Sequence, residues 1–359
     1  MELDRLSALP DCLLSLILSK LSIRDAIKCS VLSTRWRFLY TEMPHLILSP
    51  YVLAGTRAII PDARSTRLVE QRISKILQSH SSDVKYFYLS NNYFHCSFEL
   101  ITPGLCQFKR RKVSNWLRCV ARKNVERLFL QYSYQCQIPP PALFSCSRLT
   151  KLTLSCCILT TFPTNFAGFK HLTKCRLIYT ELTDDSLARF VSYCPLLLKL
   201  KLRNCVGLQR PVVSSLTLTD LYLRYRRLGS SEVTPEYLTV NCPNIKTLDA
   251  IADELRVNGT AFYEFSSFIS GLHFDFGSNL IELSLYVAGV SWRRNFSVDR
   301  FLEVVGTLRS FKVLRIECFG CVRSFNRKGV AIPLLNLLSR LPNLERFQLR
   351  GKMYLVIHE

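Results

Sequence analysis

The stretch DDSLARFVSYCPLLLKLKLRNC, from Asp184 to Cys205, contains the pattern that decides the fold. Its first half has the spacing of an amphipathic helix, which Thr183 or Asp184 would cap. The apolar face of that helix holds Leu187, Phe190 and Val191. The second half, LLKLKL from Leu197, alternates like a short strand with one buried face. One helix and one strand within about twenty residues form a unit that cannot bury its apolar face alone, so we expect stacked copies.

The strand pattern, apolar-x-x-apolar-x-apolar, recurs along most of the chain. Regular copies begin at Val125, Leu149, Leu172, Leu197 and Leu218, so they are 21 to 25 residues apart. That spacing is the period of leucine-rich repeats. Looser copies begin at Val84, Ile245, Leu280, Phe311 and Leu344, and their wider gaps predict longer helices or loops. We therefore predict an α/β solenoid, in which parallel strands form one curved sheet with helices and loops on its convex side.

The alternation also predicts which strand side chains lie on the exposed, concave face of this sheet. In the five regular copies, eight of fifteen such positions are basic and one is acidic. The basic ones are Arg127, Lys151, Lys174, Arg176, Lys199, Lys201, Arg203 and Arg224. Two interpretations stay open: these side chains merely keep the sheet soluble, or they bind an acidic target or another anion.

Composition narrows the class of protein. The chain has 359 residues, of which 48% are hydrophobic, as expected for a folded protein. Its net charge of +21 favours acidic partners, without choosing between nucleic acid, anionic lipid, phosphates and an acidic protein surface. No segment approaches the roughly 18 uninterrupted apolar residues of a membrane-spanning helix. The fifteen scattered cysteines indicate reduced thiols, with Cys157 and Cys205 structural, so we expect an intracellular protein of the nucleus, the cytoplasm or both.

The N-terminal stretch LPDCLLSLILSKL, from Leu9 to Leu21, is more apolar than one helix face requires. On a helical wheel its leucines and isoleucine span about 200°, whereas packing on one core needs about 100°. Two surfaces must therefore be covered, one by the chain's own helices and one by the repeats or by another protein. A capping box at Ser22–Asp25 predicts a second helix, and a third is expected over Arg35–Tyr40.

The segment from Asp4 to Tyr40 resembles an F-box of the plant type. The resemblance is carried by Leu9-Pro10-Asp11, the leucine-rich helix, Asp25-Ala26, Ser30-Val31-Leu32-Ser33 and Arg35-Trp36-Arg37. The rest of the chain resembles plant F-box/leucine-rich-repeat proteins, of which KVSNWLRCVARKNVERLFL and the opening stretch are typical. Many relatives carry a further FBD module after the repeats. Here the sequence stops soon after LPNLERFQLRG, so either this member lacks the module or the sequence is truncated.

The resemblance implies a substrate-recognition subunit of an SCF-type ubiquitin ligase, without catalytic residues of its own. An F-box at 1–48 would bind a Skp-family adaptor and, through it, a cullin. A connecting segment at 49–119, with a helix and a first irregular repeat, would lead to a solenoid at 120–359 that binds an unknown, possibly acidic, target protein. By resemblance, the adaptor contacts are Leu9, Pro10, Leu14, Ile17, Leu18, Leu21, Leu32, Arg35 and Trp36.

Other functions remain open. One alternative is a hormone- or anion-sensing receptor, whose anion would lie among Arg176, Lys199, Lys201, Arg203 and Arg224. Another is a basic scaffold that binds nucleic acid without a ligase role, although the aromatic stacking motifs of RNA-binding modules are missing. The lone C-x-x-C of Cys318 and Cys321 has no second ligand pair, so we expect no metal and no cofactor. The basic run Lys109–Lys112 is either a nuclear localisation signal or the start of an amphipathic helix.

Overall fold

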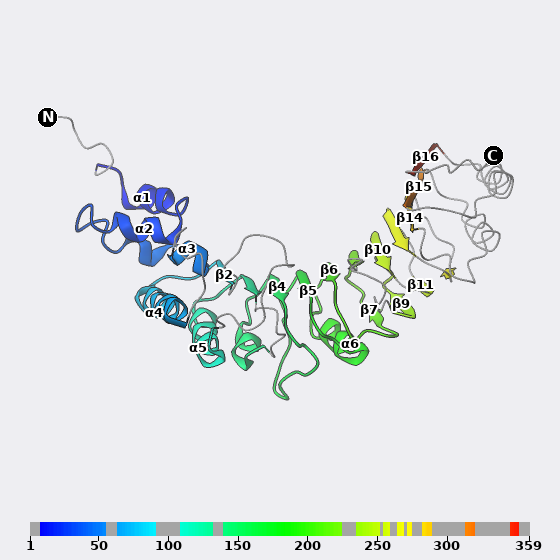
Figure 1. Cartoon of the computed structure of the whole chain (residues 1–359), viewed down its shortest axis with the longest axis horizontal. Helices are drawn as coiled ribbons and strands as arrows, with labels where there is room; N and C mark the ends of the chain where they lie inside the picture. The colour runs from blue at the N-terminus through cyan, green and yellow to red at the C-terminus, as the bar shows by residue number, and fades with distance from the viewer. Residues whose placement is uncertain are drawn as a thin grey trace. The chain divides into compact units, whose positions relative to one another are not determined.

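The computed structural model describes residues 8–54, 63–90, 108–131, 139–224 and 235–251, and six shorter segments towards the C-terminus. These shorter segments are 254–258, 264–268, 271–274, 282–288, 313–319 and 345–351. The contacts divide the chain into two compact units, Met1–Glu181 and Leu182–Glu359. We describe each unit by itself, with the element labels of Figure 1.

The first unit begins with two short α-helices, α1 (Asp11–Leu18) and α2 (Ile23–Cys29). The predicted cap of α2 is confirmed, because the Asp25 amide donates to the Ser22 hydroxyl oxygen at 3.2 Å. That hydroxyl in turn donates to the Asp25 carboxylate at 2.8 Å. Since α1 and α2 have few hydrogen-bonded turns of their own, tertiary packing of their apolar faces must stabilise them.

The prediction of a third α-helix over Arg35–Tyr40 is wrong. Turns occupy residues 34–38, and a 3-10 helix, η1 (Leu39–Glu42), follows. Its bonds reach back three residues, as from the Thr41 amide to the Phe38 carbonyl at 2.9 Å. In this tighter geometry side chains three residues apart point the same way. Trp36 and Leu39 are both buried as a result, so burial in the core overrides the α-helical pattern.

The strands of the first unit lie parallel, in the order in which they occur in the chain. They are β1 (His45–Leu48), β2 (Tyr86–Ser90), β3 (Arg127–Gln131), β4 (Lys151–Ser155) and β5 (Lys174–Ile178). The register pairs equivalent repeat positions, Tyr86 with Arg127, Arg127 with Lys151, and Lys151 with Lys174. The predicted repeat is thus confirmed here, with one addition: β1 precedes the copy at Val84 and was not predicted.

Helices cover the buried side of these strands. They are α3 (Pro50–Ala54), α4 (Ala63–Ser79), α5 (Arg110–Ala121) and the 3-10 helix η3 (Pro141–Ser145), with α4 and α5 side by side in Figure 1. The apolar face predicted for α5 is buried as expected, and Trp116 Nε1 donates to Ser74 Oγ of α4 at 3.0 Å. This bond gives the indole the polar partner that a buried tryptophan requires.

The second unit opens with α6 (Asp184–Ser192), the helix of the quoted stretch. Thr183 is its cap, in a reciprocal capping box with Ser186. The main strands that follow are again parallel, which confirms the strands predicted from the looser copies. They are β6 (Lys199–Arg203), β8 (Asp220–Arg224), β10 (Thr247–Ile251), β12 (Glu264–Phe268), β14 (Glu282–Ala288), β15 (Val313–Phe319) and β16 (Arg346–Gly351).

Between these strands lies a second parallel sheet where helices or loops were expected. Its strands are β7 (Val212–Ser214), β9 (Tyr237–Asn241), β11 (Glu254–Asn258) and β13 (Gly271–Phe274), in the order β13-β11-β9-β7. In β9, the buried Leu238 and Val240 alternate with partly exposed neighbours, which suits a strand. Strand β12 was also missed, because Ser267 stands at the register position of Ala250 and Leu223, where it interrupts the apolar pattern.

Candidate protein-binding site

The apolar residues of the N-terminal segment separate into a buried set and an exposed set. Leu14 and Leu18 of α1 are fully buried, and so is Ala26 of α2. Helix α1 packs against η1, and Trp36, three residues before η1, is 5% exposed. These side chains hold the segment together and are not available at its surface.

The exposed set is large for so short a segment. Leu13, Leu16 and Ile17 share one face of α1, and Leu16 is 56% exposed. Beyond α2, Val31 is 85% exposed and Leu32 is 65% exposed. Leu21 and Phe38 are exposed as well. Single exposed leucines are ordinary, but a group of large apolar side chains at one end of a chain indicates a surface that another molecule covers.

The residues predicted to contact an adaptor therefore have different places in the structure. Pro10, Ile17, Leu21 and Leu32 are exposed, and Leu9 is partly buried. Leu14, Leu18 and Trp36 belong to the segment's own core. Sequence reasoning left out Leu13, Leu16, Val31 and Phe38. The wide apolar arc of the first helix contained a signal for Leu13 and Leu16, whereas Val31 lies beyond α2, which ends at Cys29.

Arg35 has a structural role in this segment. Its Nε donates to Asp11 Oδ1 at 2.6 Å, and its Nη2 donates to the Leu9 carbonyl at 2.5 Å. One guanidinium thus ties the turns after α2 to the first residues of α1. The planar fork of arginine makes both bonds at once, which a lysine could not do.

The open face of β3, β4 and β5 carries the first four predicted basic residues. Lys151, Lys174 and Arg176 are exposed, and within the described part of the chain they form no ion pair. Arg127 is half-buried, with its guanidinium 5.1 Å from the centre of the Tyr86 ring and Nη2 3.3 Å from His45 Nε2. Burial lowers the pKa of His45, and the charges of Arg127 and Lys85 lower it further. This face is therefore positive and has aromatic rings beside the charge.

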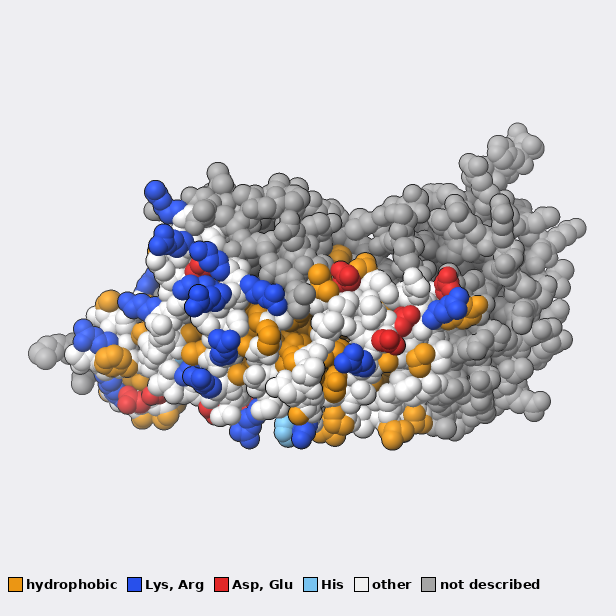
Figure 2. Space-filling model, turned by 90° about the horizontal axis from the view of Figure 1, so that it is seen from below, with side chains coloured by type: hydrophobic (Ala, Val, Ile, Leu, Met, Phe, Trp, Pro, Cys, Tyr) orange, Lys and Arg blue, Asp and Glu red, His pale blue; other side chains and the backbone are white. Residues whose placement is uncertain are grey.

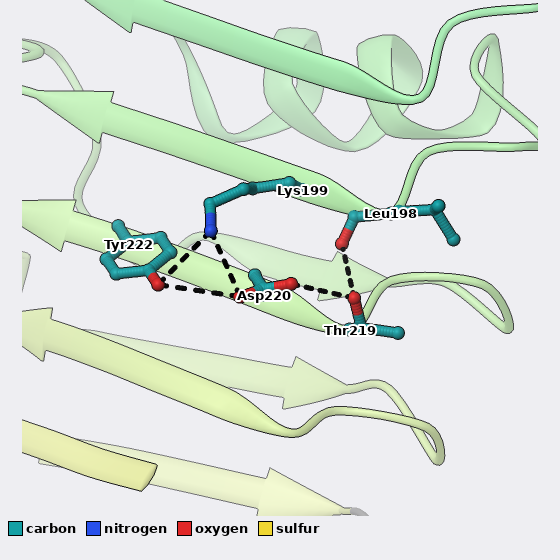
Figure 3. Close-up of polar contacts among 5 residues, drawn as sticks. All are labelled: Leu198, Lys199, Thr219, Asp220 and Tyr222. Atoms are coloured by element: carbon teal, nitrogen blue, oxygen red, sulfur yellow. Dashed lines mark hydrogen bonds and ion pairs between the residues drawn. The ribbon is translucent and has the colours of Figure 1, made fainter.

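The open face of β6, β8 and β10 carries the other four predicted basic residues, but two of them form ion pairs with carboxylates of the same face. Figure 3 shows Lys199, whose Nζ lies 3.2 Å from Asp220 Oδ1 and 3.4 Å from the Tyr222 hydroxyl. Lys201 Nζ lies over the Tyr222 ring, 4.3 Å from its centre. Arg224 pairs with Asp249 on the neighbouring strand. Arg203 is exposed. An anion at this face would have to compete with the carboxylates of Asp220 and Asp249.

These polar contacts also shift the pKa values of Lys199 and Asp220. Burial alone would raise the pKa of Asp220, but hydrogen bonds from Thr219 and Lys199 outweigh it and hold the pKa below its ordinary value. For Lys199, burial would lower the pKa, and the bonds to Asp220 and Tyr222 outweigh it and raise the pKa. Both groups are charged near neutral pH, so the contact is an ion pair.

No cofactor or metal position stands out in the described residues. They bring together no group of three or more His, Cys, Asp or Glu side chains that could hold a metal ion. Of the C-x-x-C pair, Cys321 lies outside the described residues. Cys157 and Cys205 are buried beside the strands, as the structural interpretation predicts. A membrane-crossing helix, long and apolar throughout, is not found in the part of the chain that the structure describes.

Comparison with known families matches two stretches of the chain. The F-box domain matches residues 6–39, and the family "FBD-associated F-box protein At5g56370, LRR repeats" matches residues 113–260. The chain is a plant-type F-box/leucine-rich-repeat protein. The exposed apolar set therefore lies within an F-box, and the basic strand faces lie within its repeats.

Relatives of this F-box/leucine-rich-repeat protein are known in Arabidopsis thaliana. It is 29% identical over 196 residues to the F-box/FBD/LRR-repeat protein At1g13570, covering 54% of this chain and 42% of the relative. It is 30% identical over 253 residues to the F-box/FBD/LRR-repeat protein At5g56420, covering 68% of this chain and 54% of the relative. The chain thus spans about half the length, or less, of the curated relatives it matches.

Proposed function

We propose that the protein is a substrate receptor of an SCF-type ubiquitin ligase. The observation that carries the proposal is the exposed apolar set of the F-box, in which Val31, Phe38 and Leu32 after α2 are the most exposed, followed by Leu16 on α1. Burial of such exposed apolar side chains by a partner lowers the free energy and so favours binding. A Skp-family adaptor is the partner that an F-box implies, and a cullin would be reached through it.

The repeats would then bind the protein to be ubiquitinated. On the open face of β3 to β5, Lys151, Lys174 and Arg176 are exposed and without ion pairs among the described residues. Such a face attracts an acidic surface and rejects a basic one, which gives specificity and a faster association rate. We propose that the target contacts this face with acidic side chains, in the nucleus, the cytoplasm or both.

The protein would act by holding the adaptor and the target close together, and it would catalyse no reaction itself. Binding the adaptor at one end and the target at the repeats makes ubiquitin transfer to a target lysine effectively intramolecular. This mechanism needs no catalytic side chain in the receptor.

A hormone- or anion-sensing receptor has less support from the contacts. Two of the five residues proposed to hold the anion, Lys199 and Arg224, are paired with carboxylates of adjacent strands. A small anion held by all five residues would therefore compete with Asp220 for Lys199 and with Asp249 for Arg224.

Copurification tests the proposal. The full chain, expressed together with a Skp-family adaptor and a cullin, is isolated by a tag on the receptor alone. We expect the adaptor and the cullin to be retained together, and omission of the adaptor to release the cullin. Failure of the tagged chain to retain the adaptor would overturn the proposal.

A further inference from the structure

Helices α4 and α5 carry positive charge on their exposed sides and no exposed acid. Four basic residues lie on α4 and four on α5, namely Arg64, Arg67, Arg72, Lys75, Arg110, Arg111, Lys112 and Arg118. The single acidic residue of the two helices, Glu70, is 5% exposed and accepts a hydrogen bond from the Lys109 amide at 2.8 Å. Solvent-exposed helices usually mix charges of both signs. The exclusively positive charge on the exposed sides of α4 and α5 therefore indicates a role beyond keeping the chain soluble.

Contacts between α4 and α5 hold the two helices that carry these cations together. Besides the bond between Trp116 and Ser74, the Cys119 thiol donates to the Leu77 carbonyl at 3.7 Å, and α4 packs directly on α5. Figure 2 views the chain from the side on which α4 and α5 lie in Figure 1, and Lys and Arg side chains gather there. The contacts between α4 and α5 hold the two helix backbones together, so the spacing of the cations along each helix is set before a ligand binds.

A hollow of about 410 Å³ lies on the exposed side of α5. Arg110, Arg111 and Arg118 line it on the helix, and Pro140 and Pro141 line it beside η3. Arg118 Nη1 donates to Asn115 Oδ1 at 3.0 Å, which orients the guanidinium and uses one of its five N–H donors. Arg110 and Arg111 form no ion pair with any described residue. The hollow thus combines unneutralised arginines with an apolar wall.

The spacing of the arginines fits an extended acidic peptide. Arg110 and Arg118 are eight residues apart on one helix, so their backbone positions are separated by about 12 Å. In an extended peptide, side chains four residues apart lie on one face and are separated by about 13 Å. Carboxylates at those two positions would each meet a guanidinium, whose fork binds a carboxylate through two parallel hydrogen bonds.

Nucleic acid fits this surface less well than a peptide. Sequence-tolerant binding of single strands combines a basic groove with exposed aromatic rings on which the bases stack. Of the described aromatic rings near the hollow, Phe108 and Trp116 are 5% and 3% exposed and pack against each other with centroids 5.4 Å apart, and Phe144 of η3 packs against Phe166 with centroids 4.9 Å apart. The two prolines instead offer a small apolar wall of the kind that the backbone and short side chains of a peptide cover.

We propose that the hollow beside α5 is a docking site for an extended, Asp- and Glu-rich segment of a partner protein. Arg110, Arg111 and Arg118 bind its carboxylates, Pro140 and Pro141 support its backbone, and the cations of α4 steer its approach. This site lies on the helical side of the repeats, away from the open strand face. Its operation does not depend on adaptor binding by the F-box.

Fluorescence anisotropy tests this site with the full chain and three probes: a labelled twelve-residue peptide alternating Glu with Ser and Gly, its Gln counterpart, and a mixed-sequence twelve-nucleotide DNA strand. We expect the Glu peptide to bind in a salt-dependent manner and the Gln peptide not to bind. Arg110→Gln with Arg118→Gln should weaken Glu-peptide binding at least tenfold. Glutamine has a helix propensity close to that of arginine, so α5 is expected to persist.

The matched control is Lys20→Gln with Arg24→Gln, which removes the same charge from exposed positions of the F-box. We expect it to change Glu-peptide affinity less than twofold. An equal loss in both double variants would overturn the proposal, because the net charge alone would then explain binding. So would an absence of Glu-peptide binding, or tighter binding of the DNA strand than of the peptide at the same salt concentration.

Discussion

Arg35 joins two parts of the F-box through Asp11, which is twenty-four positions before it in sequence, with Nε and Oδ1 2.6 Å apart. Both side chains are substantially exposed, at 38% and 66%, so the ion pair itself contributes at most about 1 kcal/mol. Its importance is geometric, because the same guanidinium also binds the Leu9 carbonyl where α1 begins.

Arg35→Lys should therefore loosen the first turn of α1. Lysine keeps the charge but cannot make both hydrogen bonds from one planar group. We expect the backbone amides at the start of α1 to exchange with solvent about threefold to tenfold faster, as measured by hydrogen exchange and mass spectrometry. Arg37→Lys, at a nearby exposed position, is the control and should leave the exchange unchanged. Equal exchange in both variants would contradict a structural role for Arg35.

Leu14 and Leu16 differ by two positions on α1 and should respond differently to truncation. Leu14 is fully buried, so Leu14→Ala is expected to cost about 2–5 kcal/mol, enough to unfold so small a segment. Leu16 is 56% exposed, so Leu16→Ala should cost less than about 0.5 kcal/mol. Hydrogen exchange across α1 and α2 measures both. Similar protection in the two variants would show that the division into buried and exposed residues is wrong.

Gly207 is required by the turn after β6. Its φ is +89°, and a Cβ added there would lie 2.3 Å from the Leu182 carbonyl oxygen. That approach is fixed, because the Leu182 amide donates to the neighbouring Val206 carbonyl at 2.9 Å. Gly207→Ala should therefore lower the melting temperature, with a cost of about 1–3 kcal/mol or more. Val206→Ala, at an exposed side chain next to it, should leave the melting temperature nearly unchanged. A melting temperature for Gly207→Ala equal to that of the wild type would refute the close approach.

The Lys199–Asp220 pair predicts a pH dependence of stability. Because the pKa of Asp220 is lower in the folded chain, its contribution is present above the unfolded pKa and is lost as the pH falls through the folded pKa. Because the pKa of Lys199 is raised, its contribution is complete below the unfolded pKa and is lost as the pH rises through the folded pKa. The pair thus stabilises the chain between these acidic and alkaline limits.

Asp220→Asn should remove the acidic part of this dependence. Melting temperatures measured from pH 3 to pH 7 should fall less steeply on acidification in the variant than in the wild type, and the two curves should converge at low pH. The difference at neutral pH is expected to be about 1 kcal/mol, as for a partly exposed pair. Parallel curves for the two proteins would mean that the pair does not contribute.

Sequence reasoning predicted the regular repeat strands because each has an apolar residue at every core-facing position, as at Leu200 and Leu202 of β6. It failed where that signal was weak. In strand β12, Ser267 stands at the register position of Ala250 and Leu223 and interrupts the apolar pattern. The strands of the second sheet fall in the gaps between the copies, where helices or loops were expected, and alternation within one strand does not show which sheet it joins.

The candidate binding residues were predicted in part for a similar reason. The apolar arc of α1 indicated that two surfaces are covered, but the side of each leucine depends on where α2, Trp36 and η1 pack. The pairing of Lys199 with Asp220 and of Arg224 with Asp249 depends on strand register, which the alternation of single strands does not specify. The number of basic residues on the two open faces could be counted from the sequence, whereas the ion pairs that neutralise some of them could not be predicted.

The most direct test of the central claim is the affinity of the purified full chain for a Skp-family adaptor, measured by biolayer interferometry. Leu16→Asp with Leu32→Asp places charge on exposed apolar positions of the F-box, and Leu68→Asp does so at an exposed leucine of α4. We predict that the wild type and Leu68→Asp bind the adaptor with equal affinity and that the double variant, with unchanged hydrogen exchange in its core, binds at least a hundredfold more weakly. A wild-type chain without measurable affinity, or a double variant that binds as tightly as the wild type, would contradict the account.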